Sequence, residues 1–147
     1  MTTTPHTSTI APATVAGTHP ISPRTRLVGR IVTGVVVLFF LFDSLTHIAN
    51  VEQVRTAMAD LGFDPSLNRV FGVVLLACLV IYLVPVTSIL GAVLLTGYLG
   101  GAVATNLLTE QPILSTTLAP IYFGILVWGG LYLRDARVRA IMPLVRR

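Results

Sequence analysis

The sequence predicts an all-α membrane protein, a transmembrane four-helix bundle that follows a disordered N-terminal tail. Hydrophobic residues make up 54% of the 147-residue chain and charged residues only 11%, against about 25% charged residues in ordinary soluble domains. Four windows are apolar over lengths near the roughly 20 residues that a helix needs to cross a bilayer. These windows use most of the chain, so little of it remains for a water-soluble core.

The four windows lie between a polar start and an arginine-rich end. Residues 1–23 are rich in Thr, Pro, Ala and Ser and show no periodicity, so we expect a disordered tail. Residues 24–147 form the predicted membrane domain. The first apolar window is too long for a cleaved signal peptide, and no small-x-small cleavage pattern follows it. The expected spans lie at about 27–49, 70–86, 88–108 and 114–133.

The connections between the windows indicate how the spans are arranged. Residues 50–68 are polar and predict a short surface helix, with Gly62 at its end and Pro65 opening the next helix. The turn Pro85–Ser88 is so short that the second and third spans must be antiparallel neighbours.

The basic residues predict a topology rather than a nucleic-acid surface. All ten are arginines, of which three precede the first span and five follow the fourth, against Arg55 and Arg69 in between. The positive-inside rule then places both termini in the cytoplasm, with the spans in the cytoplasmic (inner) membrane. The bilayer is the expected partner. No extended basic surface with interleaved aromatic residues suggests a nucleic-acid partner.

Asp43 and His47 are the candidate functional residues of the first span. An acid in a lipid-crossing helix costs about 2.5–3.5 kcal/mol on insertion scales, so Asp43 should face protein or water. A spacing of four residues puts Asp43 and His47 on one face. Thr105 and Asn106 in the third span and Arg69 at the start of the second are expected at similar depth, in the outer half. We therefore expect these five residues to bind a ligand or to exchange protons.

Other interpretations of this polar set stay open. Asp43 could pair with Arg69 or His47 and only hold the helices in register, or it could lie at the exposed end of a shorter span. His47 is the one histidine within the spans, whereas a membrane b-type haem needs two. The sequence names no catalytic residue and does not decide whether the protein is an enzyme.

Gly97 and Gly101 form a small-xxx-small motif in the third span. This spacing lets two helix backbones approach closely in lipid. It predicts tight helix packing, either within the chain or between two copies in a homo-oligomer.

No cofactor or metal motif is present in the sequence. We find no metal-ligand cluster, phosphate-binding loop or dinucleotide fingerprint. The single cysteine, Cys78, can form neither an intrachain disulfide nor a Cys-x-x-Cys redox pair. Electrons, if they move, must be carried by a partner or by a diffusible quinone.

Several segments resemble the DoxX-like family of small bacterial four-span proteins. They are residues 94–106 and 128–135, together with Tyr82–Pro85 and Phe42–His47, and the resemblance covers about residues 27–145. It implies a four-helix membrane bundle. The family takes its name from a subunit of a thiosulfate:quinone oxidoreductase, and other relatives are linked to membrane redox complexes. Relatives usually have histidine at Asn106 and often arginine at Val86. Because asparagine does not titrate, Asn106 cannot relay protons.

Two functional hypotheses follow. In the first, the protein is a redox-associated membrane subunit that binds a small lipid-soluble molecule such as a quinone in the outer polar pocket. In the second, it is a non-catalytic accessory or assembly subunit that packs against other membrane proteins, including redox subunits. A transporter is not favoured, because four spans without an internal repeat give little scope for alternating access.

Overall fold

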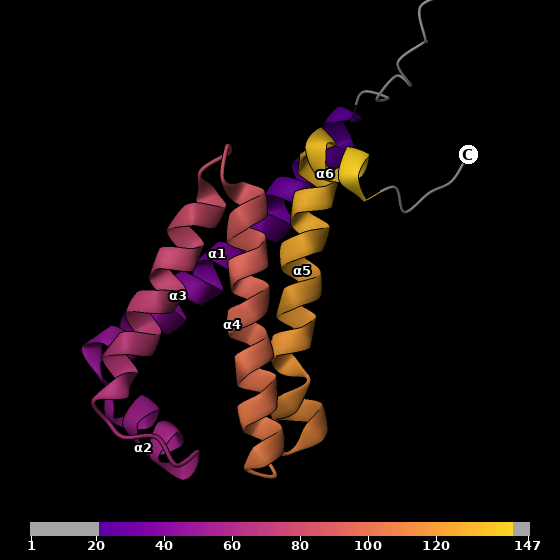
Figure 1. Ribbon diagram of the computed structural model, residues 1–147. Coiled ribbons are helices and arrows are strands. Elements are labelled where there is room, and N and C mark those ends of the chain that lie inside the picture. The colour runs from indigo at the N-terminus through magenta and orange to yellow at the C-terminus, as the bar shows by residue number, and fades with distance from the viewer. Residues whose placement is uncertain (1–20, 143–147) are drawn as a thin grey trace, which may run out of the picture.

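The computed structural model describes residues 21–142, and over these residues the chain contains helices and no strand. The prediction of an all-α chain is therefore confirmed. The predicted disordered tail lies outside the described residues up to residue 20. In chain order the elements are α1 (Pro23–Ala49), α2 (Glu52–Asp60), α3 (Leu67–Leu83), α4 (Ser88–Leu108), the π-helix η1 (Ile113–Thr117), α5 (Ala119–Arg134) and α6 (Ala136–Ile141) (Figure 1).

The first helix begins at Pro23, four residues before the expected start of the first span. The side chain of Ser22 accepts a hydrogen bond from the backbone N–H of Thr25 at 3.2 Å. This bond satisfies one of the free donors at the helix start, and Pro23 occupies the first position, where a missing N–H costs nothing. The fourth expected span is divided into η1 and α5.

Three helical stretches of the described chain are long and apolar enough to cross a membrane. They are Pro23–Ala49, Ser88–Leu108 and Ile113–Arg134. The fourth apolar helix, α3, has 17 residues. At about 1.5 Å per residue it is shorter than a hydrocarbon layer of about 30 Å. A count of four spans therefore stays a prediction. Large apolar side chains such as Leu38 and Phe42, each 69% exposed, cover the outside of α1 where lipid would contact them.

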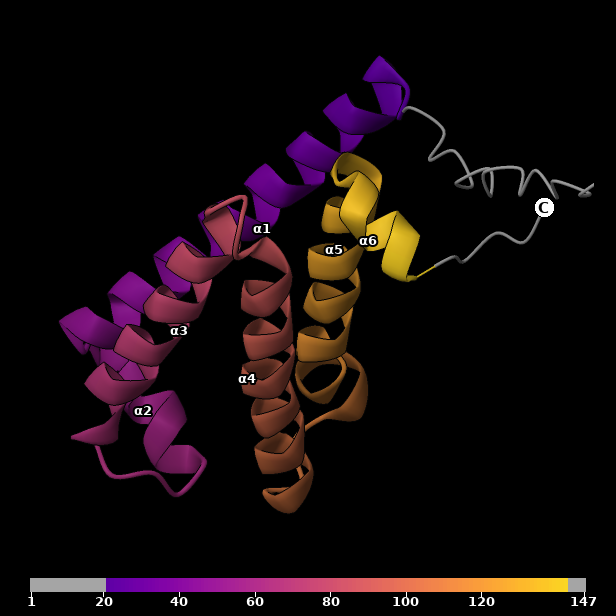
Figure 2. The same cartoon turned by 45° about the horizontal axis from the view of Figure 1, so that its top comes forward.

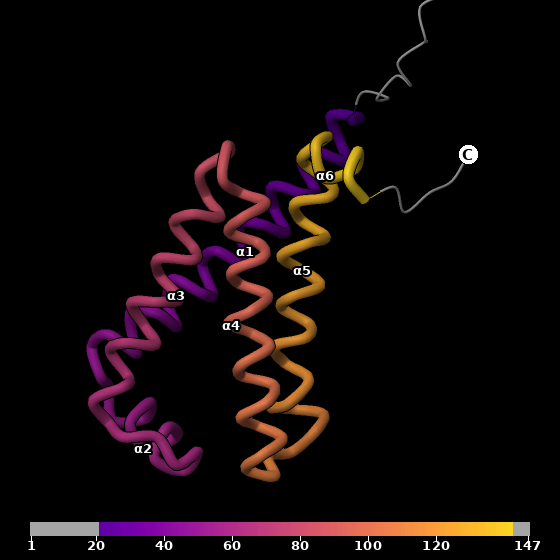
Figure 3. The backbone as a smooth tube through the Cα atoms, in the orientation of Figure 1, coloured from indigo at the N-terminus to yellow at the C-terminus, as the bar shows by residue number. Residues whose placement is uncertain are grey.

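Four helices contact one another in a ring: α1, α3, α4 and α5. α1 packs against α3 and α5, and α4 packs against the same two helices from the other side. Figure 2 shows α1 crossing the other helices obliquely, with its first turns extending beyond the end of α5. The backbone trace in Figure 3 follows α1 from there to α2, so the two described ends of the chain lie at one end of the molecule. We call this the termini end, and the end with α2 and η1 the open end.

The packed core fills the half of the molecule nearest the termini end. Its central residue is Tyr82 on α3, which is fully buried and donates a hydrogen bond to the carbonyl oxygen of Val127 at 3.0 Å. From the turn that joins them, α3 and α4 diverge toward the open end (Figure 1). The fully buried apolar residues around Tyr82 are Val36, Leu75, Ala92, Leu95 and Val127.

The closest helix contacts use glycines other than the predicted pair. A Cβ atom added at Gly91 would lie 2.3 Å from the backbone nitrogen and Cα of Tyr82, and one at Gly72 would lie 2.7 Å from a backbone oxygen of α1. Gly29 and Gly130 make similar approaches between α1 and α5. A Cβ at Gly97 or Gly101 would meet nothing within 4 Å. Their motif therefore does not bring two helices of this chain into close contact.

We predict that Gly91→Ala destabilises the protein. The added methyl group would collide with the backbone of α3, and forced overpacking of this kind costs about 1–3 kcal/mol. Thermal unfolding in a mild detergent should show a lower midpoint. Gly34→Ala is the matched control, because its Cβ would meet nothing within 4 Å and alanine favours a helix by about 1 kcal/mol. A Gly91→Ala protein as stable as Gly34→Ala would contradict the packing described here.

Candidate functional site

A cavity of about 630 Å³ opens where the helices diverge. It lies toward the open end, and its walls come from α1, α2, α3, α4, η1 and the start of α5. Most of the lining side chains are apolar or aromatic, and most of the polar groups lie on the last turns of α1 and α4 and on η1. We call it the polar-ended cavity. Four of the five predicted ligand or proton-exchange residues line it: Asp43, His47, Thr105 and Asn106.

Asp43 and His47 face each other on the last turns of α1. The His47 Nε2 atom lies 3.8 Å from the Asp43 Oδ1 atom, which is longer than a hydrogen bond but close enough for an ion pair when the imidazole is protonated. The His47 side chain is 13% exposed and that of Asp43 is 38% exposed. The Nδ1 atom of His47 is buried and has no hydrogen-bond partner among the described residues. Buried polar atoms usually have a hydrogen-bond partner, so this nitrogen is a candidate contact for a ligand.

Asn106 connects α4 to the segment that follows it. The residue is buried, and its side-chain amide donates a hydrogen bond to the carbonyl oxygen of Thr116 at 3.1 Å. This contact draws η1 over the end of α4, where Thr116 also lines the cavity. Thr105 precedes Asn106 and is half-buried at the cavity wall. The structure thus gives Asn106 a structural hydrogen bond beside any contact it makes with a ligand.

Arg69 does not belong to this group. Its side chain is exposed on the first turn of α3, it does not line the cavity, and it forms no ion pair with Asp43 in the described part of the chain. The neighbouring residue Asn68 is buried instead and donates a hydrogen bond to Asn50 Oδ1 at 2.7 Å. That bond ties the start of α3 to the end of α1. The ion pair between Asp43 and Arg69, one of the interpretations left open by the sequence, is absent from the structure.

Sequence reasoning missed the aromatic wall of the cavity. Tyr98 lines it from α4, two helical turns before Thr105 and so on the same face. The seven-residue spacing from Thr105 could have identified Tyr98 as a candidate from the sequence. Phe39 and Phe123 stack with their ring centroids 4.1 Å apart and close the side between α1 and α5. No sequence signal pairs these two phenylalanines, because they lie on helices far apart in the chain.

Gly97 and Gly101 also line the cavity. Because they lack side chains, the wall of α4 recedes at two positions one turn apart, and the cavity gains width there. The same motif that predicts helix packing from sequence instead leaves room for a ligand or for a helix from outside this chain.

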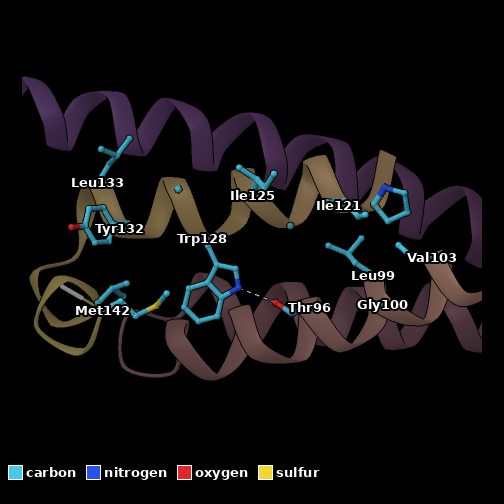
Figure 4. Close-up of a pocket in the computed structure, with 14 residues that line it drawn as sticks. Thr96, Leu99, Gly100, Val103, Ile121, Ile125, Trp128, Tyr132, Leu133 and Met142 are labelled. Atoms are coloured by element: carbon cyan, nitrogen blue, oxygen red, sulfur yellow. Dashed lines mark hydrogen bonds between the residues drawn. The ribbon is translucent and has the colours of Figure 1, made fainter. Parts of the chain in front are cut away.

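A second, more apolar groove of about 670 Å³ lies between α4 and α5 (Figure 4). The Trp128 Nε1 atom donates a hydrogen bond across it to Thr96 Oγ1 at 2.9 Å. Ile121 and Ile125 face the groove from α5. No acidic or histidine side chain lines it, so it suits an acyl chain better than a polar head group. Within residues 21–142 no group of three or more His, Cys, Asp or Glu side chains is placed to hold a metal ion.

Comparison with protein families identifies the chain. A model of the DoxX-like family matches residues 31–130. The protein belongs to the DoxX-like family. Membership, together with the three long apolar helices, makes it a multi-pass membrane protein in contact with the lipid bilayer. The matched region includes Asp43, His47 and all of α4, so the polar-ended cavity lies within the family domain. Comparisons with curated proteins and with solved structures gave no match.

We predict that Gly101→Leu fills the polar-ended cavity without unfolding this DoxX-like protein. The new side chain would enter space that is empty around Gly101. It should slow the labelling of a cysteine introduced at Thr105 by N-ethylmaleimide severalfold, in a background where native Cys78 is buried. Gly100→Leu is the matched control, because Gly100 lines the other groove. Equal labelling rates in both variants would mean that this cavity is not open in the membrane.

Proposed function

We propose that this DoxX-like protein binds a small lipid-soluble molecule with a polar head group, such as a quinone, in the polar-ended cavity. The observation that carries the proposal is the unpartnered Nδ1 atom of His47, which is buried beside Asp43 at the polar end of an otherwise apolar cavity. The cavity volume of about 630 Å³ lies within the roughly 300–1,000 Å³ of typical ligand sites.

The arrangement suits a ligand that is apolar along most of its length and accepts or donates protons at one end. Stacked Phe39 and Phe123 offer a flat apolar wall to a ring. The imidazole of His47 can donate a hydrogen bond to a carbonyl oxygen, or accept one from a hydroxyl group, according to its protonation state. Asp43 lies on the Nε2 side of that imidazole, 3.8 Å away, and would form an ion pair with the ring whenever it carries a proton. Together the pair would give and take the proton of the head group.

Electron transfer would need a partner. The family resemblance links relatives to membrane redox complexes, so we propose that other redox subunits bind this protein and supply the electrons. The bound quinone would then be the one redox-active group at this site, and the residues of the chain would position its head group and exchange its protons.

We also propose a topology of four spans with both ends in the cytoplasm, in the cytoplasmic membrane. The two described ends lie together at the termini end (Figure 1). Arg26, Arg30 and Arg134 line one pocket there, and Arg137 donates a hydrogen bond to Pro85, which lines the same pocket. This cluster of positive charge favours the cytoplasmic side. The polar-ended cavity would then lie in the outer half of the membrane. Local thinning of the bilayer around α3 would accommodate its short length.

The direct test of binding uses purified protein in lipid nanodiscs and a short-chain ubiquinone analogue. Asp43→Asn and His47→Gln should each weaken binding by about 10–100-fold, the loss expected for a hydrogen bond to a charged group. Both variants should still insert into the membrane. Arg69→Gln is the matched control and should bind normally, since Arg69 lies outside the cavity.

The fluorescence of Trp128, the single tryptophan of the chain, tests whether the ligand binds instead in the groove between α4 and α5. Strong quenching of its fluorescence by the analogue would place the ligand between α4 and α5 instead. Full binding by both Asp43→Asn and His47→Gln would overturn the site.

A non-catalytic accessory or assembly role is the second candidate, favoured by the open surface at Gly97 and Gly101. A helix of a second copy or of a partner subunit could pack there. In this case Gly101→Leu should abolish a crosslink to the partner or to the second copy, whereas Asp43→Asn should leave it intact. Unchanged crosslinking in Gly101→Leu would count against the role.

A further inference from the structure

A second polar pocket lies at the termini end, far from the polar-ended cavity. Its volume is about 250 Å³. The side chains that line it are those of Arg26 and Arg30 from α1, Pro85 and Ser88 from the turn between α3 and α4, and Arg134 and Asp135 from the end of α5. We call it the arginine pocket. The function proposed above does not use it.

Local packing forces these arginines together. Gly29 brings α1 so close to α5 that an added Cβ would lie 2.9 Å from the backbone nitrogen of Arg134. Because Arg30 follows Gly29 directly and Arg26 lies one turn earlier, both side chains leave α1 near Arg134. The Arg134 guanidinium then lies over the ring of Tyr82, with Cζ 5.3 Å from the ring centroid. Three positive charges therefore meet where α1 crosses the end of α5.

The charge of this pocket is not balanced within the described residues. The Nε atom and one terminal nitrogen of Arg134 are buried and have no hydrogen-bond partner. The carboxylate of Asp135 accepts hydrogen bonds from Arg137 at 3.2 Å and 2.7 Å, and among the described residues it forms its ion pair with Arg137 rather than with Arg134. The hydrogen bond from Arg137 also keeps the pKa of Asp135 below its usual value. Arg137 is in turn fixed to the turn between α3 and α4, through the carbonyl oxygen of Pro85.

We propose that Arg26, Arg30 and Arg134 form a binding site for a phosphate-bearing anion at the membrane surface. Guanidinium nitrogens that are buried without a partner, as two are in Arg134, carry a desolvation cost, and an anion in the pocket would supply the missing negative charge. The exposed guanidinium groups of Arg26 and Arg30 present planar pairs of donors, which match the oxygens of a phosphate. The same chemistry serves the head group of an anionic phospholipid and free inorganic phosphate.

The pocket lies at the level where an anionic head group would be found. It adjoins the ends of α1 and α5, two of the helical stretches long enough to cross the membrane. Basic residues beside a membrane span attract anionic lipids in general. Binding at a specific site depends on which arginines are present. General electrostatic attraction depends only on how many there are.

The test compares variants that remove the same charge from different positions. Arg30→Gln and Arg134→Gln remove pocket arginines, and Arg24→Gln removes an exposed arginine of the same helix that does not line the pocket. Arg30 is itself exposed, so its variant keeps the proposal testable if Arg134→Gln fails to fold. Each full-length protein is reconstituted in nanodiscs of phosphatidylglycerol and phosphatidylcholine, released in a mild detergent, and weighed by native mass spectrometry for retained lipid. A second arm measures thermal unfolding in a non-ionic detergent, in inorganic phosphate against chloride at equal ionic strength.

If a lipid head group occupies the pocket, the unaltered protein retains phosphatidylglycerol. Arg30→Gln and Arg134→Gln then bind it at least about tenfold more weakly, the loss expected for one charge-assisted hydrogen bond. Arg24→Gln retains the lipid. If free phosphate occupies it, the first arm shows no selective retention, and phosphate raises the unfolding midpoint of the unaltered protein and of Arg24→Gln alone. No effect in either arm, or equal losses in all three variants, would overturn the site. These readouts do not involve the polar-ended cavity, so they succeed or fail independently of quinone binding.

Discussion

The contact between Gly91 and Tyr82 fixes the arrangement of the helices on which both sites depend. Packing rather than hydrophobicity holds helices together in lipid, so contacts of this closeness carry much of the association. The missing side chain at Gly91 allows α4 to touch the backbone of α3 beside their turn. Tyr82 then reaches α5 through its hydrogen bond to Val127. Three helices are thereby joined near the termini end, and they diverge beyond it.

This divergence explains why the two ends of the protein differ in chemistry. At the open end, polar groups must find partners because lipid offers none. Asn68 donates a hydrogen bond to Asn50, and Asn106 donates one to Thr116. These two amides hold the connecting segments over the cavity. His47 retains a free ring nitrogen. At the termini end, the helices are tightly packed, and two guanidinium nitrogens of Arg134 are buried without a partner among the described residues.

The sequence predicted the helical class, the membrane setting and the family, because each depends on composition and on local patterns that survive without a structure. A long apolar window predicts a membrane-spanning helix whatever the helix packs against.

The rotation of each helix about its axis could not be predicted from the sequence. Arg69 was one of two possible partners of Asp43, yet its neighbour Asn68 is the residue that is buried. The Gly97 and Gly101 motif has the right spacing for packing, but spacing does not reveal which glycine meets another helix, and Gly91 does so instead. The grouping of Asp43, His47, Thr105 and Asn106 required two helices to be placed side by side. The sequence is compatible with this placement but does not determine it.

The empty space beside Gly97 and Gly101 allows α4 to carry a side chain at either position without a collision. Small side chains at these two positions would narrow the cavity stepwise while the contacts that hold the helices together stayed as they are. If the cavity holds the ligand proposed above, different glycines of a single helix govern the size of that ligand and the stability of the fold. Related chains could diverge in what they bind by exchanging one or two methyl groups, with no compensating change elsewhere.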